Sequence, residues 1–516
     1  MRAMTMISPR SRLARCLLVG GAALLGACSA TLDFRQCQSD SDCKRFTEEG
    51  PLRCNLESAV CVTATCKGHD DCGELGADFV CGYDNLCVEA VDDACEFAVL
   101  PGDKIEDPMV VIGGIVDASS ASGKAAKAAM TMAVEDFNAK AAFANGGAAA
   151  LMICDGEGTE AASKKVAEHL VTTVGVTTLL GPQEDDLFVA IAEKVSLAAG
   201  NNIFSMSPTA IAPLSIDDKS LVWRTTPSAW LHGHVLKSRI TALGANSAVV
   251  LFHNDRRSVA LFEAVTDVDM NNNRLIMVDG LTQQTNLSYV DGAGGSAAYD
   301  TLVGLVKSPD LLIIFGGEEV TEILAHVASQ PTLPGRIIVS DQALAALPAA
   351  LAGIGSQDFV DRLEVLSPVR ADPTNGPLFA ARFTAKNADL PYDDAVGLGY
   401  DATMVSLLAM RTVPKDKRFL GPTIAAGMVR LSSGVPVSFN DFDTLAFVET
   451  ADTELGKGAS IDLTGVSGDL KFEDGELCAP FVALGFGEVA NPAVTVARTY
   501  SFSSCAAAKV GGAWDK

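Results

Sequence analysis

The sequence predicts an α/β protein with two doubly wound parallel-sheet lobes, preceded by a small disulfide-rich segment. Two observations support this fold class. Apolar runs of strand length alternate with helical stretches over about 400 residues, as in parallel sheets with helical crossovers. Eleven of the 14 cysteines lie at or before Cys95 in a chain of 516 residues. At about 150 residues per domain, the 421 residues after Cys95 suffice for two or three units with their own cores.

Composition excludes one class of function and disfavours disorder. The chain has 64 acidic and 39 basic residues, a net charge of −25, whereas nucleic-acid binding requires a basic surface that neutralises phosphates. The hydrophobic fraction of 48% is ordinary for a globular protein. Aromatic residues make up 6%, which weakens interpretations that need stacking platforms for sugars or bases.

Residues 1–27 are predicted to be a signal peptide. The segment carries four arginines and no acid, and then an apolar run of twelve residues from Cys16 to Ala27. A run of that length cannot span a bilayer core of about 30 Å, so it is not expected to be a transmembrane helix.

The signal segment ends in Leu25-Gly26-Ala27-Cys28, which resembles the lipobox of bacterial lipoproteins. The resemblance implies that Cys28 is lipidated and becomes the first mature residue. The alternative is an ordinary cleaved signal followed by an accidental cysteine. Ser29 follows where an aspartate would indicate inner-membrane retention, so the expected location is the cell envelope, lipid-anchored, at the outer rather than the inner membrane.

Residues 28–95 are predicted to form a cysteine-rich module with two repeats, 37–61 and 66–87. Both repeats open with a cysteine, four variable residues, an aspartate and a second cysteine, CQSDSDC and CKGHDDC. Few large apolar residues are present, so disulfides are expected to replace a core. Two bridges per repeat are predicted without a pairing order, among Cys37, Cys43, Cys54 and Cys61, and among Cys66, Cys72, Cys81 and Cys87. Zinc held by four thiolates is the alternative, but the short CxxC spacing is missing and an exported protein is oxidised.

Outside the two repeats and the signal segment, four cysteines remain: Cys95, Cys154, Cys478 and Cys505. Four is an even number and therefore fits two further bridges. We predict the pairs Cys95–Cys154 and Cys478–Cys505.

The elements of the body follow in order. Residues 109–116 (MVVIGGIV) form an apolar run typical of a strand buried on both faces, and helical periodicity follows over 124–140. Further strands are predicted at 148–154, 177–180, 203–206, 247–252, 273–278, 311–315 and 337–339, with helices at 160–174 and 185–199. This number of strand–helix units is larger than one sheet usually holds. It predicts two lobes, with a ligand cleft at the carboxyl ends of the strands.

Over residues 110–502 the chain resembles the type I periplasmic binding proteins, specifically the leucine/isoleucine/valine-binding branch, which also includes receptor ligand-binding regions. The resemblance rests on the order and spacing of VVIGGIVDASSASGKAAKAAMTMAVEDFNA, VGVTTLLGP, IFSMSPTAIAPL, VWRTTPS, LGYDATMVSLLA, GPTIAAGM and LTGVSGDLKFEDG. It implies three chain crossings, with lobe 1 at 108–228 plus 343–440 and lobe 2 at 229–342 plus 441–510.

In this family, hydroxyls and backbone amides at helix N-termini hold a ligand carboxylate, and an acid from the other lobe holds the ligand ammonium. On lobe 1 the resemblance implies ligand contacts from Ser119, Ser120, Ser207 and Thr209. After Gly181-Pro182, where relatives have serines, this chain has Gln183, Glu184 and Asp185. These acids either cap the following helix or face the cleft, where they would favour a cationic or neutral ligand.

On lobe 2 the resemblance implies ligand contacts from Arg257, Ser258, Glu318 and Asp341. Ser258 lies where relatives often have an aromatic clamp, and Glu318 occupies a usually aromatic position of a binding turn. Asp341 matches the acid that pairs with the ligand ammonium. The arginine is either solvated or supplies positive charge to the cleft.

The sequence predicts no enzyme, no cofactor and no metal site. SASGKA lacks the first glycine and the final hydroxyl residue of a phosphate loop, and neither HExxH nor GxSxG occurs. The leading expectation is a lipid-anchored solute-binding protein that closes around a small polar ligand, such as an amino acid or related metabolite, for a permease or sensor. The alternative is an outer-membrane lipoprotein that contacts envelope proteins, for example as a regulator of peptidoglycan synthesis, without a small ligand.

Overall fold

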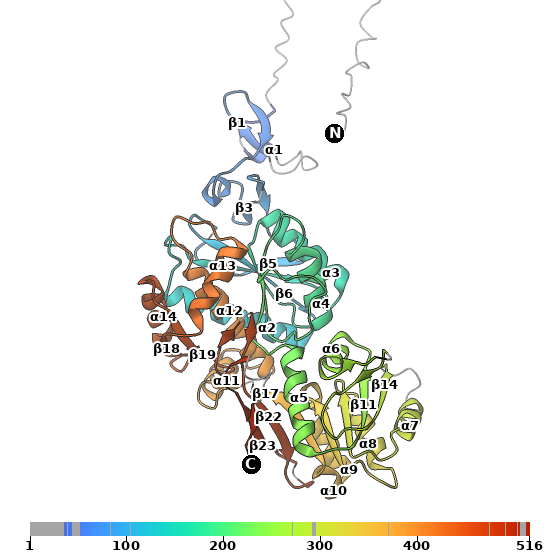
Figure 1. The fold of residues 1–516 in the computed structure, drawn as a ribbon. Helices are drawn as coiled ribbons and strands as arrows, with labels where there is room; N and C mark the ends of the chain where they lie inside the picture. The colour runs from blue at the N-terminus through green and yellow to red at the C-terminus, as the bar shows by residue number, and fades with distance from the viewer. Residues whose placement is uncertain are drawn as a thin grey trace, which may run out of the picture. The chain divides into compact units, whose positions relative to one another are not determined.

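The computed structural model describes residues 36–38, 40–43, 52–82, 84–103, 105–270, 272–290, 296–369, 371–473, 475–490, 492–502, 504–505 and 512–515 (Figure 1). The predicted signal peptide and Cys28 lie outside these residues. The chain divides into two compact units, one up to residue 62 and one from residue 63 onwards. No helix among the described residues is both long enough and apolar enough to cross a membrane.

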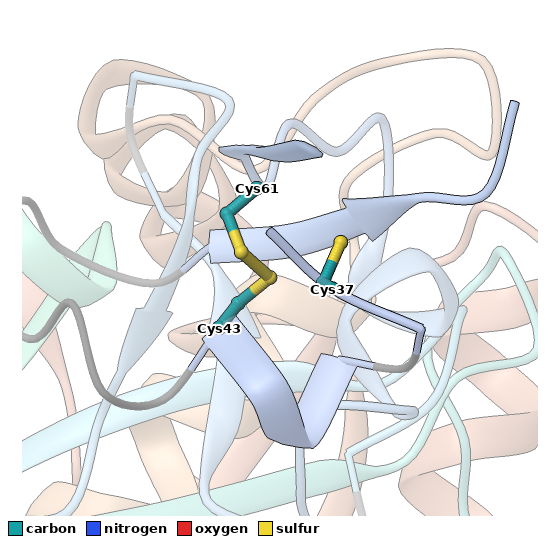
Figure 2. A group of neighbouring side chains, drawn as sticks. All are labelled: Cys37, Cys43 and Cys61. Carbon is teal, nitrogen blue, oxygen red and sulfur yellow. A yellow bond between two sulfur atoms is a disulfide. The ribbon is translucent and has the colours of Figure 1, made fainter. Parts of the chain in front are cut away.

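The first unit is organised by sulfur rather than by a hydrophobic core. It contains helix α1 (Asp40–Cys43) and the two-stranded sheet of β1 (Leu52–Asn55) and β2 (Val60–Thr63). Disulfides join Cys37 to Cys54 and Cys43 to Cys61, and Figure 2 shows the second bridge beside Cys37. Leu52 is the one buried residue of this cluster that is not a cysteine among those the structure describes.

The second repeat has the same connectivity, first cysteine to third and second to fourth. Disulfides join Cys66 to Cys81 and Cys72 to Cys87 around a short helix η2 (His69–Cys72) and the hairpin of β3 (Phe79–Cys81) and β4 (Cys87–Glu89). Three sulfur atoms of each repeat lie within 4.8 Å of one another. Each of them is bonded to another sulfur and therefore offers no thiolate to a metal.

The expected module 28–95 is not a single unit. The second repeat belongs to the unit that contains the lobes, because Val80 and Ala90 are buried in one cluster with Val111 and Ile115 of a lobe strand. Its last residue, Cys95, lies in an edge strand of the first lobe sheet.

The first lobe contains a six-stranded sheet in the order β10-β9-β8-β6-β7-β5. Five strands run parallel, and β5 pairs antiparallel with β7 at the edge, with Cys95 opposite Cys154 and disulfide-bonded to it as predicted. The strands are β5 (Cys95–Val99), β6 (Val110–Val116), β7 (Ala149–Asp155), β8 (Thr178–Leu180), β9 (Phe204–Ser207) and β10 (Val222–Arg224).

Helices cover both faces of this sheet (Figure 1). One face packs on α3 (Glu160–Glu168), η3 (His169–Val174) and η4 (Ala192–Ser196). The other face packs on α2 (Ala121–Lys140), whose buried alanines allow the close approach of α12 (Asp394–Arg411). Also in this lobe are α4 (Asp185–Ile191), α11 (Asn375–Lys386), α13 (Gly421–Met428), α14 (Ala446–Gly456) and the parallel pair β18 (Val435–Ser438) and β19 (Ile461–Thr464).

The second lobe contains an eight-stranded sheet in the order β14-β11-β15-β16-β17-β22-β23-β24. Its first five strands are parallel, the orientation that the sequence predicts, whereas the last three form an antiparallel extension. The predicted strand 273–278 is wrong: only Arg274–Leu275 forms a strand there, which pairs antiparallel with Asp267–Val268 outside this sheet, and β14 takes the edge position instead. The strands are β11 (Ser247–His253), β14 (Gln283–Tyr289), β15 (Leu311–Phe315), β16 (Arg336–Ser340), β17 (Leu363–Pro368), β22 (Phe481–Phe486), β23 (Val494–Ser501) and β24 (Ala513–Trp514).

Helices again cover both faces of the second sheet. One face packs on α5 (Ala229–Leu243) and α6 (Arg256–Val265). The other face packs on α7 (Ser296–Gly304), α8 (Val320–Ala328) and α9 (Leu347–Ile354). The disulfide between Cys478 and Cys505, also as predicted, lies in the first of these clusters.

Two expected lobe boundaries are wrong. Residues 363–368, expected in lobe 1, form β17, which pairs in parallel with β16 and so extends the second sheet. Residues 446–464, expected in lobe 2, form α14 and β19, whose apolar side chains are buried in the first lobe. The chain therefore passes between the lobes after β10, after β17 and before β22.

A buried carboxyl group in the first lobe should make stability depend on pH. Asp401 of α12 accepts hydrogen bonds from Val466 N at 2.9 Å, and from Ser467 N at 2.7 Å and Oγ at 2.6 Å. Burial, only partly offset by these bonds, raises the pKa of Asp401 from 3.8 to about 6. The folded state thus holds this proton more tightly than the unfolded chain does.

The protonated Asp401 should therefore contribute to the free energy of unfolding. We expect this contribution to be fully present below pH 4 and to be lost as the pH rises through 6, a change on the order of 3 kcal/mol. Asp401→Asn should lack it, so the difference in unfolding free energy between wild type and variant should change between pH 4 and pH 7. Urea unfolding at both pH values measures this. The exposed Asp389→Asn variant is the control, and a pH dependence that is the same in Asp401→Asn and wild type contradicts the assignment.

Candidate functional site

The residues expected to bind a ligand lie at the carboxyl ends of parallel strands in both lobes. On the first lobe, β8 leads through Gly181-Pro182 into α4, and β9 ends at Ser207. On the second lobe, β11 leads into α6, and β16 ends at Ser340, one residue before Asp341. This arrangement is the usual location of ligands in doubly wound sheets.

Arg257 of α6 joins the two lobes inside this cleft. Its Nη1 donates to Asp185 Oδ2 at 3.0 Å and to the carbonyl oxygen of Thr209 at 2.8 Å, both on the first lobe. Its Nη2 lies 3.7 Å from Asp341 Oδ1 on the second lobe. The side chain is only 9% exposed, and the two carboxylates 6% and 4%. One buried guanidinium is therefore shared by a carboxylate from each lobe, an arrangement that we call the interlobe bridge.

The charges of the interlobe bridge stabilise one another. Burial disfavours the charged guanidinium, but the carboxylates of Asp185 and Asp341 outweigh burial and raise the pKa of Arg257. Asp185 also accepts hydrogen bonds from the backbone amides of Ile211 at 2.7 Å and Ala212 at 2.5 Å. These bonds fix the carboxylate in the cleft before any ligand arrives.

The capping interpretation of the acids after Gly181-Pro182 is wrong for Asp185, which faces Arg257. Glu184 occupies the N-cap position of α4 but makes no side-chain capping bond, and it is exposed. The next residue, Asp186, accepts from Arg256 Nε at 3.1 Å, which forms a second ion pair between the lobes, although a more exposed one.

The hydroxyl groups expected to hold a carboxylate have other partners. Ser207 Oγ is buried, donates to the carbonyl oxygen of Pro182 at 3.3 Å and accepts from Ala210 N at 3.1 Å. Thr209 Oγ1 donates to the carbonyl oxygen of Gln183 at 2.6 Å. These bonds tie the turn after β9 to the turn after β8.

Ser119 and Ser120 also serve the local backbone. Ser120 Oγ caps α2 by accepting from Gly123 N at 3.0 Å. Ser119 Oγ donates to Asp117 Oδ1 at 2.6 Å, a bond that lowers the pKa of the Asp117 carboxyl. Neither serine lines the cleft cavity defined below.

On the second lobe, Ser258 and Glu318 do not reach the cavity. Ser258 N and Oγ both donate to the carboxylate of Asp255, the N-cap of α6, at 2.7 and 2.9 Å. Glu318 is exposed, and its neighbour Glu319 turns inward, where Tyr289 Oη donates to it at 2.9 Å. Burial, and secondly this carboxylate, raise the pKa of Tyr289 well above its usual range.

A cavity of about 360 Å³ remains beside the interlobe bridge, which we call the cleft cavity. It brings together five of the predicted site residues, Gln183, Glu184, Asp185, Thr209 and Arg257. Asp186, the next acid after Asp185 in the run that follows Gly181-Pro182, lines the cavity as well, whereas the sequence did not identify Asp255, Gln342 and Ala395. Of these, only Gln342, directly after Asp341, carried a usable signal.

The lining of the cleft cavity is polar and mainly acidic. Its four carboxylates face one guanidinium, and no aromatic ring contributes. Asp341 does not line it, and its Oδ1 lies 3.7 Å from Arg257 Nη2. Among the described residues, every group of three histidine, cysteine or acidic side chains close enough to share a metal includes a disulfide cysteine. With this lining, the cleft cavity offers a ligand hydrogen-bonding groups and negative charge.

Adjacent arginines allow a direct test of the interlobe bridge. Arg257→Met should lower the free energy of unfolding by about 3–5 kcal/mol, because it leaves the buried carboxylate of Asp185 without its countercharge. Arg256→Met, which breaks only the exposed pair with Asp186, should cost about 1 kcal/mol or less. Urea unfolding at pH 7 measures both, and equal losses would contradict the bridge geometry.

Comparisons with known proteins agree with the two-lobed fold. The model of the receptor family ligand binding region matches residues 125–482. The leucine-binding protein LivK from Thermotoga maritima is 19% identical, with 76% of this chain and 98% of that chain covered at a TM-score of 0.53. The isoleucine complex of LivJ from Streptococcus pneumoniae is 16% identical, with 75% and 99% covered at 0.53.

A third similar structure binds a different class of molecule. It is a fatty acid ABC transporter substrate-binding protein from Thermomonospora curvata, 12% identical, with 76% of this chain and 92% of that chain covered at a TM-score of 0.51. No curated protein sequence matches the chain. At these identities the solved structures establish the fold of substrate-binding proteins and not a ligand. With its match over most of the two lobes, the chain belongs to the receptor family ligand binding region.

Proposed function

We propose that the chain is an extracytoplasmic solute-binding protein that closes its lobes around a small polar ligand for transport or sensing. The observation that carries this proposal is the cleft cavity, which receives polar side chains from both lobes. A ligand that touches Thr209 and Gln342 at once favours the closed state, because those contacts exist only when the lobes meet.

The charge of the cleft cavity favours a cationic or neutral ligand over a simple carboxylate. Arg257 is already shared by Asp185 and Asp341, which leaves Glu184 and Asp255 as further negative charges at the cavity. A basic amino acid or a related amine metabolite fits this lining. The leucine, isoleucine and fatty acid named for the similar structures therefore do not transfer to this chain.

A thermal-shift screen with amino acids, amines and organic acids tests this function. A ligand at 100 times its Kd should stabilise the fold by about 2.7 kcal/mol. Glu184→Gln, which removes an exposed carboxylate from the cavity, should weaken a cationic ligand several-fold. Glu322→Gln, which removes an exposed acid from the first turn of α8, should leave affinity unchanged. A screen without any shift contradicts the proposal.

The interlobe bridge favours the second candidate, an interaction protein without a small ligand. Arg257 already neutralises Asp185 and lies close to Asp341, so the lobes are joined by a group of the chain itself. In this role the protein is an outer-membrane lipoprotein that contacts other envelope proteins, such as the enzymes of peptidoglycan synthesis. A screen without any shift, together with a copurified envelope partner, would favour this candidate.

Both candidates include a lipid anchor on Cys28 and a location in the cell envelope, at the outer rather than the inner membrane. Cys28→Ala should remove the thiol that receives the lipid, so the variant should not incorporate radiolabelled palmitate and should appear in the soluble envelope fraction. Wild type should fractionate with outer membranes. Incorporation of label into Cys28→Ala would contradict the assigned anchor.

A further inference from the structure

A second cavity lies away from the lobe cleft, between the second cysteine repeat and the first lobe. It has a volume of about 860 Å³. The side chains that matter here are Lys67, His69, Met109, Lys417, Arg418 and Leu420, and we call the cavity the basic groove. It shares no lining residue with the cleft cavity.

The repeat wall of the basic groove is fixed to the lobe. The disulfide of Cys66 with Cys81 anchors the segment that carries Lys67. His69 Nδ1 accepts from Cys81 N at 3.1 Å, which leaves the ring proton on Nε2. The backbone N–H of His69 donates to Asp107 Oδ1 at 3.2 Å, and Asp107 N donates to Asp70 Oδ1 at 3.0 Å. The groove is thus built by cross-linked and hydrogen-bonded backbone.

The charge of the basic groove is opposite to that of the chain. Lys67, Lys417 and Arg418 are exposed, and none of them forms an ion pair with another residue in the described part of the chain. The only acid in the lining is Asp107, whose carboxylate already accepts from the repeat backbone. In a protein of net charge −25, three cations beside one occupied acid form a local positive surface.

Apolar groups lie among these charges. Leu420 is 48% exposed, and Met109 and Phe419 are half-buried in the same lining. A surface on which cationic side chains surround exposed apolar groups is typical of a protein-binding site with a polar rim.

We propose that the basic groove binds an acidic peptide segment of a partner protein, with carboxylates on Lys67, Lys417 and Arg418 and an apolar side chain against Leu420. Three exposed cations line the groove, so several carboxylates along one extended segment can pair with them at once, whereas a single small acid offers one carboxylate. Attraction between exposed charges steers association and is weakened by salt.

Fluorescence anisotropy with the full chain in nonionic detergent tests this proposal. The probe is a fluorescein-labelled peptide of alternating glutamate and leucine, with a lysine–leucine peptide as its opposite-charge control. Lys67→Glu and Lys417→Glu should each weaken binding of the acidic probe by about fivefold or more. Lys415→Glu is the matched control, because this exposed lysine lies two residues from Lys417 outside the groove.

Three results would overturn the proposal. The acidic probe fails to bind at low salt, or Lys415→Glu weakens binding as much as Lys417→Glu does. In the third, polygalacturonate binds more tightly than the peptide through the same lysines, which would assign the groove to an acidic glycan. Because all three lysines are exposed, unchanged melting temperatures should show that the variants remain folded.

Discussion

The arrangement of the cleft depends on one buried guanidinium that is shared between the lobes. Arg257 neutralises Asp185 and approaches Asp341, and the buried guanidinium and the Asp185 carboxylate would each be costly to bury without the other. The backbone amides of Ile211 and Ala212 hold Asp185 in place, so the bridge is attached to the turn after β9. What remains for a ligand is the acidic cavity beside it.

The fold was predictable because its signals are local. The apolar run at 109–116 and the alternation of strands with helices gave the parallel sheets, and paired cysteines gave the bridges of Cys95–Cys154 and Cys478–Cys505. The end of the second sheet was not predictable in this way. Strand β17 belongs to the second sheet because it pairs with β16. Nothing in the six residues of β17 indicates which lobe the strand joins.

The candidate site was predictable as a set of loops but not as a set of contacts. Gln183 to Asp185 and Arg257 line the cleft cavity, yet the sequence did not show that Asp185 and Arg257 bind each other across it. Glu318 and Glu319 are adjacent and chemically equivalent, and the hydrogen bonds from Tyr289 Oη and Gly317 N distinguish Glu319. Such choices are made by tertiary contacts between distant segments, which one sequence does not contain.

The central claim is that Arg257 and Asp185 bind each other across the lobes. A double-mutant cycle with Arg257→Met, Asp185→Asn and the double variant, followed by urea unfolding at pH 7, measures their coupling most directly. The bridge predicts a coupling energy of about 2 kcal/mol or more, because Arg257→Met leaves the buried Asp185 carboxylate without its countercharge, a cost that Asp185→Asn removes. A coupling energy near zero, with additive losses, would contradict it.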